Sequence, residues 1–178
     1  MADGSDVTPA ERRDLHRMID QEADRMLSLV QDLLDFSRGS VSIEKETVDA
    51  AEYMKRIEKT IEPYFKPRGL TVSVNCQYPV PFRIDPDRFL RVLVNIAGNA
   101  AEALPPGGRF EMSVSGVDSR VRFSLSDNGP GIPESIRGSL FQPFVTHGKS
   151  SGTGLGMAIA RTMVEAHGGT IWFETETG

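Results

Sequence analysis

The sequence has a single cysteine, Cys76, so no disulfide framework can form within the chain. It also lacks an apolar run approaching the roughly 20 residues that a membrane-spanning helix requires. No signal-peptide pattern opens it. An excess of positive charge is lacking as well, and the net charge of −5 argues against broad nucleic-acid binding. These shortages exclude a disulfide-rich scaffold and a membrane segment in this chain, and we expect a cytoplasmic location and no nucleic-acid partner.

At 178 residues and 39% hydrophobic content, the chain can build one domain with an appendage. Residues 9 to 38 carry apolar side chains alternately three and four apart. They are Leu15, Ile19, Met26, Leu29, Leu33 and Phe36. A stripe this narrow needs a partner helix, because one helix cannot bury it alone. The spacing therefore predicts one long N-terminal helix that forms half of a two-helix or bundle seam.

The remaining chain alternates strand and helix patterns, and its expected strands are short. Helices are expected from Asp49 to about Pro67, over 85–104, and after Gly156. The expected strands are 41–48, 70–75, 82–84, a hairpin of 109–117 and 120–127 that turns at Asp118 and Ser119, and a last strand over 171–176. This order predicts an α+β fold, a two-layer sandwich whose mixed sheet is covered on one face by helices.

A glycine turn precedes the helix that carries Leu155 and Met163 on one face. Gly152, Gly154 and Gly156 place backbone amides at the helix N-terminus, where unpaired N–H groups and the helix dipole favour an anion. The turn predicts a phosphate site, although an ordinary loop into a helix would show the same glycines.

A second glycine turn follows Asp127 and contains Gly129 and Gly131. An ionised carboxylate only accepts hydrogen bonds, so an exocyclic amine of a base is a fitting partner for Asp127. An ordinary turn after a strand remains the alternative here. A Rossmann or Walker A site is excluded, because no glycine fingerprint joins a first strand to a helix and no Gly-Lys-Ser/Thr occurs.

Two asparagines lie four residues apart in the helix expected over 85–104, so Asn95 and Asn99 share one face. Asparagine favours caps and turns over helix interiors. One explanation is hydrogen bonding to a neighbouring loop. The other is that the Asn99 carbonyl ligates magnesium, which takes few protein ligands and binds substrate phosphates.

Together these motifs resemble the GHKL (Bergerat) ATP-binding fold and, within it, the catalytic domain of sensor histidine kinases. Asn95 to Asn99 resembles the N box, Asp127 to Gly131 the first glycine box, Phe141 to Phe144 the F box, and Gly152 to Gly156 the second glycine box. His-Gly-Gly at 167–169 also fits. The resemblance implies a catalytic ATP-binding domain at 46–178, a linker at 39–45, and at 1–38 the second helix of a dimerisation and phosphoacceptor hairpin.

The resemblance implies a protein-histidine kinase of a two-component signal transduction system, with ATP and Mg²⁺ as cofactors. Asn95 and Asn99 would serve catalysis, and Asn99 would hold the metal. The implied nucleotide contacts are Asn99, Glu102, Ala103, Asp127, Gly129, Gly131, Ile132, Thr146, Lys149, Gly152, Thr153, Gly154, Leu155 and Gly156. Phe141 and Phe144 are expected to be core anchors at the base of a lid that closes over the phosphates.

None of the three histidines matches the family's phosphoacceptor pattern, since Arg17 follows His16. We therefore expect this chain to bind ATP without being able to phosphorylate itself. Its expected partners are a separate phosphoacceptor helix and the receiver domain of a response regulator. The parent protein is expected to be a homodimer, with any membrane anchor outside this chain.

Three alternatives stay open: a GHKL ATPase, an anti-sigma-type serine kinase, and a nucleotide-binding module without kinase activity. GHKL enzymes that hydrolyse ATP carry a glutamate base at the position of Asn95, and a neutral amide cannot take that proton. The kinase is therefore favoured over the ATPase. A serine kinase of this type usually lacks a helix like that expected over 9–38.

Overall fold

A computed structural model describes Thr8, Arg12, Leu15, His16, Ile19, Val30 and residues 42–146 and 153–176. The chain divides into two compact units, Met1–Gly39 and Ser40–Gly178. The described residues of the first unit after Thr8 are helical, and the Arg12 amide donates to the Thr8 carbonyl at 2.9 Å. The rest of the helix expected over residues 9 to 38 lies outside the described residues.

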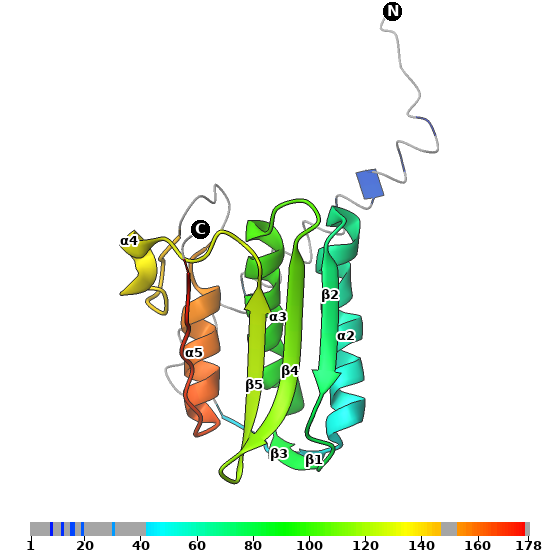
Figure 1. The fold of residues 1–178 in the computed structure, drawn as a ribbon, viewed down its shortest axis with the longest axis vertical. Coiled ribbons are helices and arrows are strands. Elements are labelled where there is room, and N and C mark those ends of the chain that lie inside the picture. The colour runs from blue at the N-terminus through cyan, green and yellow to red at the C-terminus, as the bar shows by residue number, and fades with distance from the viewer. Residues whose placement is uncertain are drawn as a thin grey trace, which may run out of the picture. The chain divides into compact units, whose positions relative to one another are not determined.

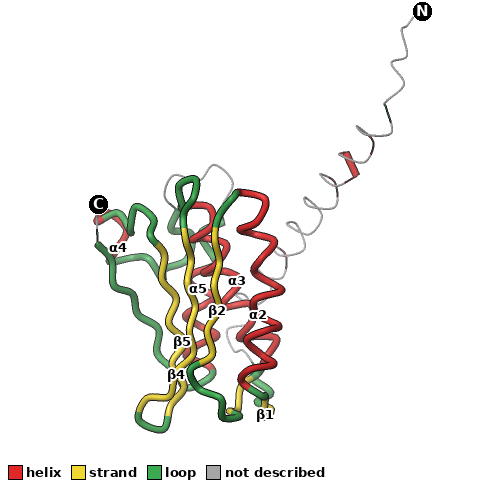
Figure 2. The backbone as a smooth tube through the Cα atoms, turned by 45° about the vertical axis from the view of Figure 1, so that its right-hand side comes forward, coloured by secondary structure: helices red, strands yellow, loops and turns green. Residues whose placement is uncertain are grey.

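The second unit has two layers, with a sheet on one side and helices on the other (Figures 1 and 2). Its three-stranded sheet has the order β2 (Thr71–Cys76), β4 (Arg109–Val117), β5 (Arg120–Asp127). β2 pairs with β4 in parallel, and β4 pairs with β5 in antiparallel orientation. The covering helices are α2 (Ala50–Phe65), α3 (Pro86–Ala103) and α5 (Gly156–Ala166). The expectation of a mixed sheet with helices on one face is confirmed.

Shorter elements complete this unit. β1 (Glu46–Val48) pairs with β3 (Phe82–Ile84) as a separate antiparallel pair, so the expected strand over 41–48 is shorter than the alternation suggested. The 3₁₀ turn η1 (Lys66–Arg68) ends α2, and α4 (Glu134–Arg137) is a single turn after β5. No helix among the described residues has the length and apolarity to cross a membrane.

The two long helices begin at aspartate caps. Asp49 accepts a hydrogen bond from the Glu52 amide at 2.8 Å, and Asp85 accepts one from the Arg88 amide at 3.1 Å. Each bond satisfies one of the N–H groups that the first turn of a helix leaves unpaired. Gly69 follows η1 with φ of +66°, a conformation that glycine adopts without a Cβ penalty. These local signals account for the confirmed bounds of α2 and α3.

The β4–β5 hairpin turns through two residues with positive φ, Asp118 at 48° and Ser119 at 64°. Two such residues form the turn that matches the twist of the flanking strands. The resulting register pairs Asp127 with Phe110. The hairpin was predicted from its alternating pattern, and it delivers Asp127 to the end of the sheet.

Two apolar clusters hold the layers together. The larger joins α2, α3 and the sheet, and Ile57, Ile61 and Phe65 of α2 are fully buried in it. The second joins α3 to α5 through Val92, Leu155, Ile159, Ala160, Met163 and Val164. α5 is therefore held mainly by α3.

The prediction of a last strand is wrong, because residues 171–176 do not form a strand in this structure. Their recorded contacts use side chains in place of a backbone ladder. The Arg122 guanidinium lies 5.4 Å from the centre of the Trp172 ring, and the Thr175 hydroxyl accepts a hydrogen bond from the Ile132 amide at 2.8 Å. Alternation predicts an extended segment but cannot supply the ladder that defines a strand.

Candidate functional site

α3 presents the two asparagines as half-buried side chains on one helical face. The Asn95 Nδ2 donates a hydrogen bond to the Gly156 carbonyl at 3.1 Å, at the first residue of α5. Asn99 lies one turn further along α3, and Glu102 and Ala103 are exposed on its last turn. The side of α3 that carries the two asparagines therefore contacts the N-terminus of α5 at Asn95.

The first glycine turn lies beside the C-terminal end of α3. A Cβ added to Gly129 would lie 3.6 Å from Cδ2 of Leu104, the residue that caps the end of α3. The Gly129 amide donates to Asp127 Oδ1 at 2.9 Å, which fixes the exposed carboxylate against its own turn. Asp127 and Gly129 thus lie beside the last turn of α3, which carries Ala103.

Gly131 and Ile132 continue this turn and are fastened to the segment after α5. Gly131 has φ of +74°, and a Cβ there would lie 2.1 Å from the Glu176 carbonyl oxygen. The Ile132 amide donates to the Thr175 hydroxyl. Only glycine fits this backbone approach, because 2.1 Å is far inside van der Waals contact.

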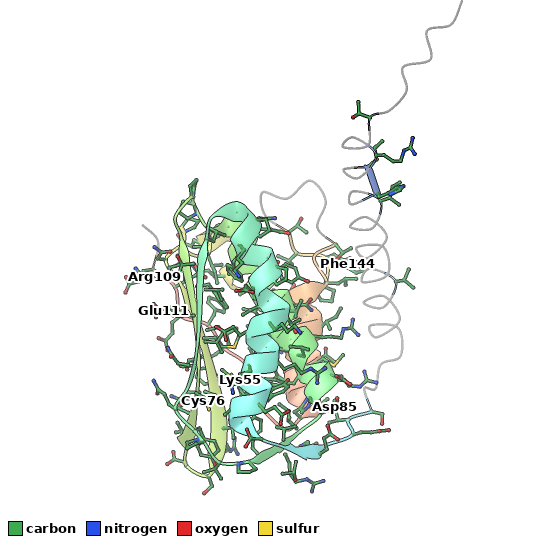
Figure 3. The ribbon with its side chains drawn as sticks, turned by 90° about the vertical axis from the view of Figure 1, so that its right-hand side faces the viewer. Lys55, Cys76, Asp85, Arg109, Glu111 and Phe144 are labelled. Carbon is green, nitrogen blue, oxygen red and sulfur yellow. The ribbon has the colours of Figure 1, made fainter. Side chains whose placement is uncertain are left out.

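Backbone contacts hold the second glycine turn to the end of the Phe141–Phe144 motif. The Phe144 amide donates to the Gly154 carbonyl at 2.9 Å, and Gly154 has φ of +67°. A Cβ on Gly154 would lie 2.5 Å from the Phe144 carbonyl carbon. We call the Phe144–Gly154 contact the neck, since it joins the two ends of the segment between them. Figure 3 shows Phe144 beside the N-terminal end of α5.

Other predicted site residues lie around the neck. Leu155 is 3% exposed and packs in the α3–α5 cluster, and its amide donates to the Thr153 hydroxyl at 3.4 Å. Thr146 is exposed. Lys149 and Gly152 lie outside the described residues, so their predicted roles stay predictions.

The expectation that Phe144 is a core anchor is wrong, because its side chain is 66% exposed. Its backbone closes the neck instead, with φ of +65°. Phe141 is half-buried, with its ring centre 6.0 Å from that of Phe173. The sequence motif alone does not distinguish the two phenylalanines. The backbone geometry at Phe144 shows that their roles differ.

The donor set fits a cation that is held mainly by substrate. Among the described residues, no group of three or more His, Cys, Asp or Glu side chains could hold a metal ion. Asn99 offers one neutral amide oxygen, and magnesium commonly combines one or two protein ligands with phosphate and water. Magnesium brought by a nucleotide therefore suits this site better than a resident metal.

Two ionisable groups of α2 hold the start of α3 in place. The buried Tyr53 hydroxyl donates to the Pro86 carbonyl at 2.8 Å, and burial raises the pKa of Tyr53 above its usual range. The Arg56 guanidinium donates to the exposed Asp87 carboxylate, and that hydrogen bond raises the pKa of Arg56. Both contacts stabilise the α2–α3 pair that carries the asparagines.

Sequence reasoning missed a polar cluster at the far end of α3 and α5. Asp85 is 8% exposed, and besides capping α3 it accepts a hydrogen bond from the Glu44 amide at 3.0 Å. The His167 Nε2 accepts one from the Asp85 amide at 3.1 Å, and the Lys45 ammonium donates to the His167 carbonyl at 2.7 Å. The His-Gly-Gly motif was noticed in the sequence, but nothing there pointed to these partners.

Comparison with known proteins identifies a family and individual relatives with similar sequences. The sequence profile of the family described as "Histidine kinase-, DNA gyrase B-, and HSP90-like ATPase" matches residues 84–178. The alginate biosynthesis sensor protein KinB of Pseudomonas aeruginosa is 31% identical over 177 residues, which cover 96% of this chain and 30% of KinB. The sensory histidine kinase/phosphatase NtrB of Klebsiella oxytoca is 33% identical over 174 residues, covering 91% and 48%. The chain thus spans less than half the length of both relatives.

Solved structures give the same result for the fold. Full-length ShkA in complex with AMPPNP superposes with a TM-score of 0.76 at 29% identity, covering 97% of this chain and 38% of ShkA. The catalytic domain of histidine kinase ThkA, in a nucleotide-free form, superposes with a TM-score of 0.64 at 28% identity, covering 72% and 87%. The resemblance drawn from the four motifs is confirmed.

Proposed function

Because this chain belongs to the histidine kinase-, DNA gyrase B-, and HSP90-like ATPase family, we propose that it binds ATP with magnesium and transfers the γ-phosphoryl group to a histidine. The observation that carries the proposal is the asparagine face of α3. That face meets the second glycine turn through Asn95 and Gly156, and Leu104, which caps the C-terminal end of the same helix, lies beside Gly129 of the first glycine turn. One nucleotide lying along that face would reach both turns.

The two ends of the site suit different parts of a nucleotide. Asp127 offers a carboxylate oxygen to the exocyclic amine of adenine, and Gly129 and Gly131 let the base approach the backbone. Near the N-terminus of α5, the amides of Gly154 and Gly156 favour phosphate. Lys149, Thr146 and the other predicted contacts would complete the phosphate end.

Asn99 would hold magnesium through its side-chain oxygen. The metal would supply positive charge that offsets the negative charge developing on the phosphates. The protein's own contribution is positioning, since phosphoryl transfer depends on in-line attack by the acceptor on the γ-phosphorus atom. The acceptor here would be an imidazole nitrogen of a separate helix, and the bond to the leaving ADP oxygen breaks as the new N–P bond forms.

The whole protein's organisation follows from the same proposal. Residues 1–38 would be the second helix of a dimerisation hairpin, 39–45 the linker, and 46–178 the catalytic domain. We also propose that the parent protein is a homodimer and that this region of it is cytoplasmic. A receiver domain would then accept the phosphoryl group from the histidine. With no matching acceptor histidine, this chain would need a separate acceptor helix for activity.

The test combines labelled ATP, magnesium, this chain and an acceptor-helix protein from a histidine kinase. Acid-labile label on the acceptor's histidine is the expected result. An acceptor in which that histidine is changed to glutamine is the control, and it should remain unlabelled. Release of free phosphate without labelled protein would favour the ATPase. Tight nucleotide binding with neither product would favour a binding module and contradict the kinase proposal.

A further inference from the structure

Hydrogen bonds from α3 hold α5 at both of its ends. At the N-terminal end, the Asn95 Nδ2 donates to the Gly156 carbonyl at 3.1 Å. At the C-terminal end, the Asp85 amide donates to Nε2 of His167 at 3.1 Å. Between them, the α3–α5 cluster is apolar and tightly buried, with Ala160 and Met163 fully inaccessible. α5 is therefore seated on α3 along its whole length.

The C-terminal attachment uses both nitrogens of the His167 ring. Nε2 accepts the Asp85 amide hydrogen, so the other nitrogen is the donor. That nitrogen, Nδ1, lies 2.7 Å from the Met163 carbonyl and donates to it. Both ring nitrogens are thus satisfied, and the Phe89 ring packs edge-on with its centre 5.5 Å away.

The segment that leads into β1 is fastened to the same end of α5. The Lys45 ammonium donates to the His167 carbonyl at 2.7 Å, and the Glu44 amide donates to Asp85 Oδ2 at 3.0 Å. Arg83 of β3 also donates to the Lys45 carbonyl at 3.0 Å. We call residues 42–45 the entry segment, since they precede β1. Figure 3 labels Asp85 at the end of this unit where the chain enters α2.

We propose that α5 couples the phosphate end of the nucleotide site to the entry segment. This inference rests on the proposed function, because it requires a nucleotide at the N-terminus of α5. Eleven residues make a rod of about 16 Å. A helix moves as one body, so phosphates that draw in the amides near Gly156 also set the position of His167. The entry segment binds that residue, so its docking should depend on nucleotide.

Coupling of this kind is reciprocal. If nucleotide strengthens docking of the entry segment, then loss of the docking contact weakens nucleotide binding by the same factor. The contact at stake is a single hydrogen bond from an ammonium group, which limits that factor to about threefold to tenfold. The nucleotide itself need not touch the entry segment.

The Glu44 amide is a direct reporter, because its hydrogen is bonded to Asp85 Oδ2. We would measure its hydrogen exchange by NMR in the full chain, with and without saturating ADP and magnesium. Nucleotide should slow exchange at Glu44 by about threefold to tenfold in the unaltered chain. Lys45→Met should abolish most of that slowing and weaken ADP binding by a similar factor. Lys55→Met removes an exposed lysine of α2 and is the matched control that should behave like the unaltered chain.

Three results would overturn the inference, and they are distinguishable. Bound ADP that leaves Glu44 exchange unchanged in the unaltered chain would show that the two ends are not coupled. Equal slowing in the Lys45→Met variant would show that the coupling does not run through the contact between Lys45 and His167, on which the inference rests. Failure of the unaltered chain to bind ADP would refute the proposed function itself, and the inference would fall with it.

Discussion

Replacing Gly154 with alanine should damage nucleotide binding through the neck. Gly154 has φ of +67°, and forcing a residue with a Cβ into this region costs about 1–2 kcal/mol. The new Cβ would also lie 2.5 Å from the Phe144 carbonyl carbon, 2.7 Å from the Val145 nitrogen and 2.8 Å from the Phe144 Cα. All three are backbone atoms that cannot rotate away, and overpacking adds about 1–3 kcal/mol.

The total strain of about 2–5 kcal/mol can be relieved by opening the neck. Opening breaks the hydrogen bond from the Phe144 amide to the Gly154 carbonyl and displaces the amides at the N-terminus of α5. If binding must restore even about 1.4 kcal/mol of that strain, affinity falls tenfold. We therefore expect the dissociation constant for ATP, measured by calorimetric titration, to rise at least about tenfold.

Two other glycines provide matched controls. Gly69 has φ of +66° with nothing within 4 Å of an added Cβ, so Gly69→Ala carries the backbone strain without the clash. Gly138 has φ of −68° and equally open surroundings, so Gly138→Ala should carry neither cost. Both variants should bind ATP like the unaltered chain. Native affinity in Gly154→Ala, with the Phe144 amide still protected from exchange, would refute this reasoning.

Three further predictions concern the metal, the buried tyrosine and the α3 cap. Asn99→Ala should bind ATP with an affinity that no longer responds to magnesium, as titrations with and without EDTA would show; a retained magnesium response would place the metal elsewhere. Burial raises the pKa of Tyr53, so its contribution to stability is present below pH of about 10 and is lost as pH rises further. In urea unfolding, Tyr53→Phe should be less stable at neutral pH by about 1 kcal/mol, and the gap should close above pH of about 10; a constant gap would contradict the assignment. Asp85→Ala should lower the free energy of unfolding by about 2 kcal/mol, because the α3 cap and the acceptor for Glu44 are both lost. Asp85→Asn keeps a capping oxygen and should lose less, so equal losses would count against the cap.

The helices and the hairpin could be predicted because their signals are local. Asp49 and Asp85 precede apolar residues at helical spacing, and the β4–β5 hairpin shows strict alternation. Each pattern is enough to predict its own element. The last strand could not be predicted correctly, because a strand requires a backbone partner and residues 171–176 make side-chain contacts.

The candidate site was predictable to the level of motifs and no further. Glycine spacing identified two turns, and the structure gives each a distinct reason: Gly131 meets the Glu176 carbonyl, and Gly154 meets the backbone of Phe144. Those neighbours lie far along the chain or in another motif, so no local pattern names them. The cluster of Asp85, His167 and Lys45 was missed for the same reason, since 122 residues separate Lys45 from His167.

The most direct test of the account is ATP titration of the unaltered chain and of Asp127→Ala, each with magnesium. Glu111→Ala is the control, because it removes the same charge from the neighbouring strand, where Glu111 pairs with Ser126. The account predicts saturable binding by the unaltered chain and by Glu111→Ala, and none by Asp127→Ala, since the carboxylate that receives the adenine amine is gone. Unchanged affinity in Asp127→Ala would contradict the assigned pocket.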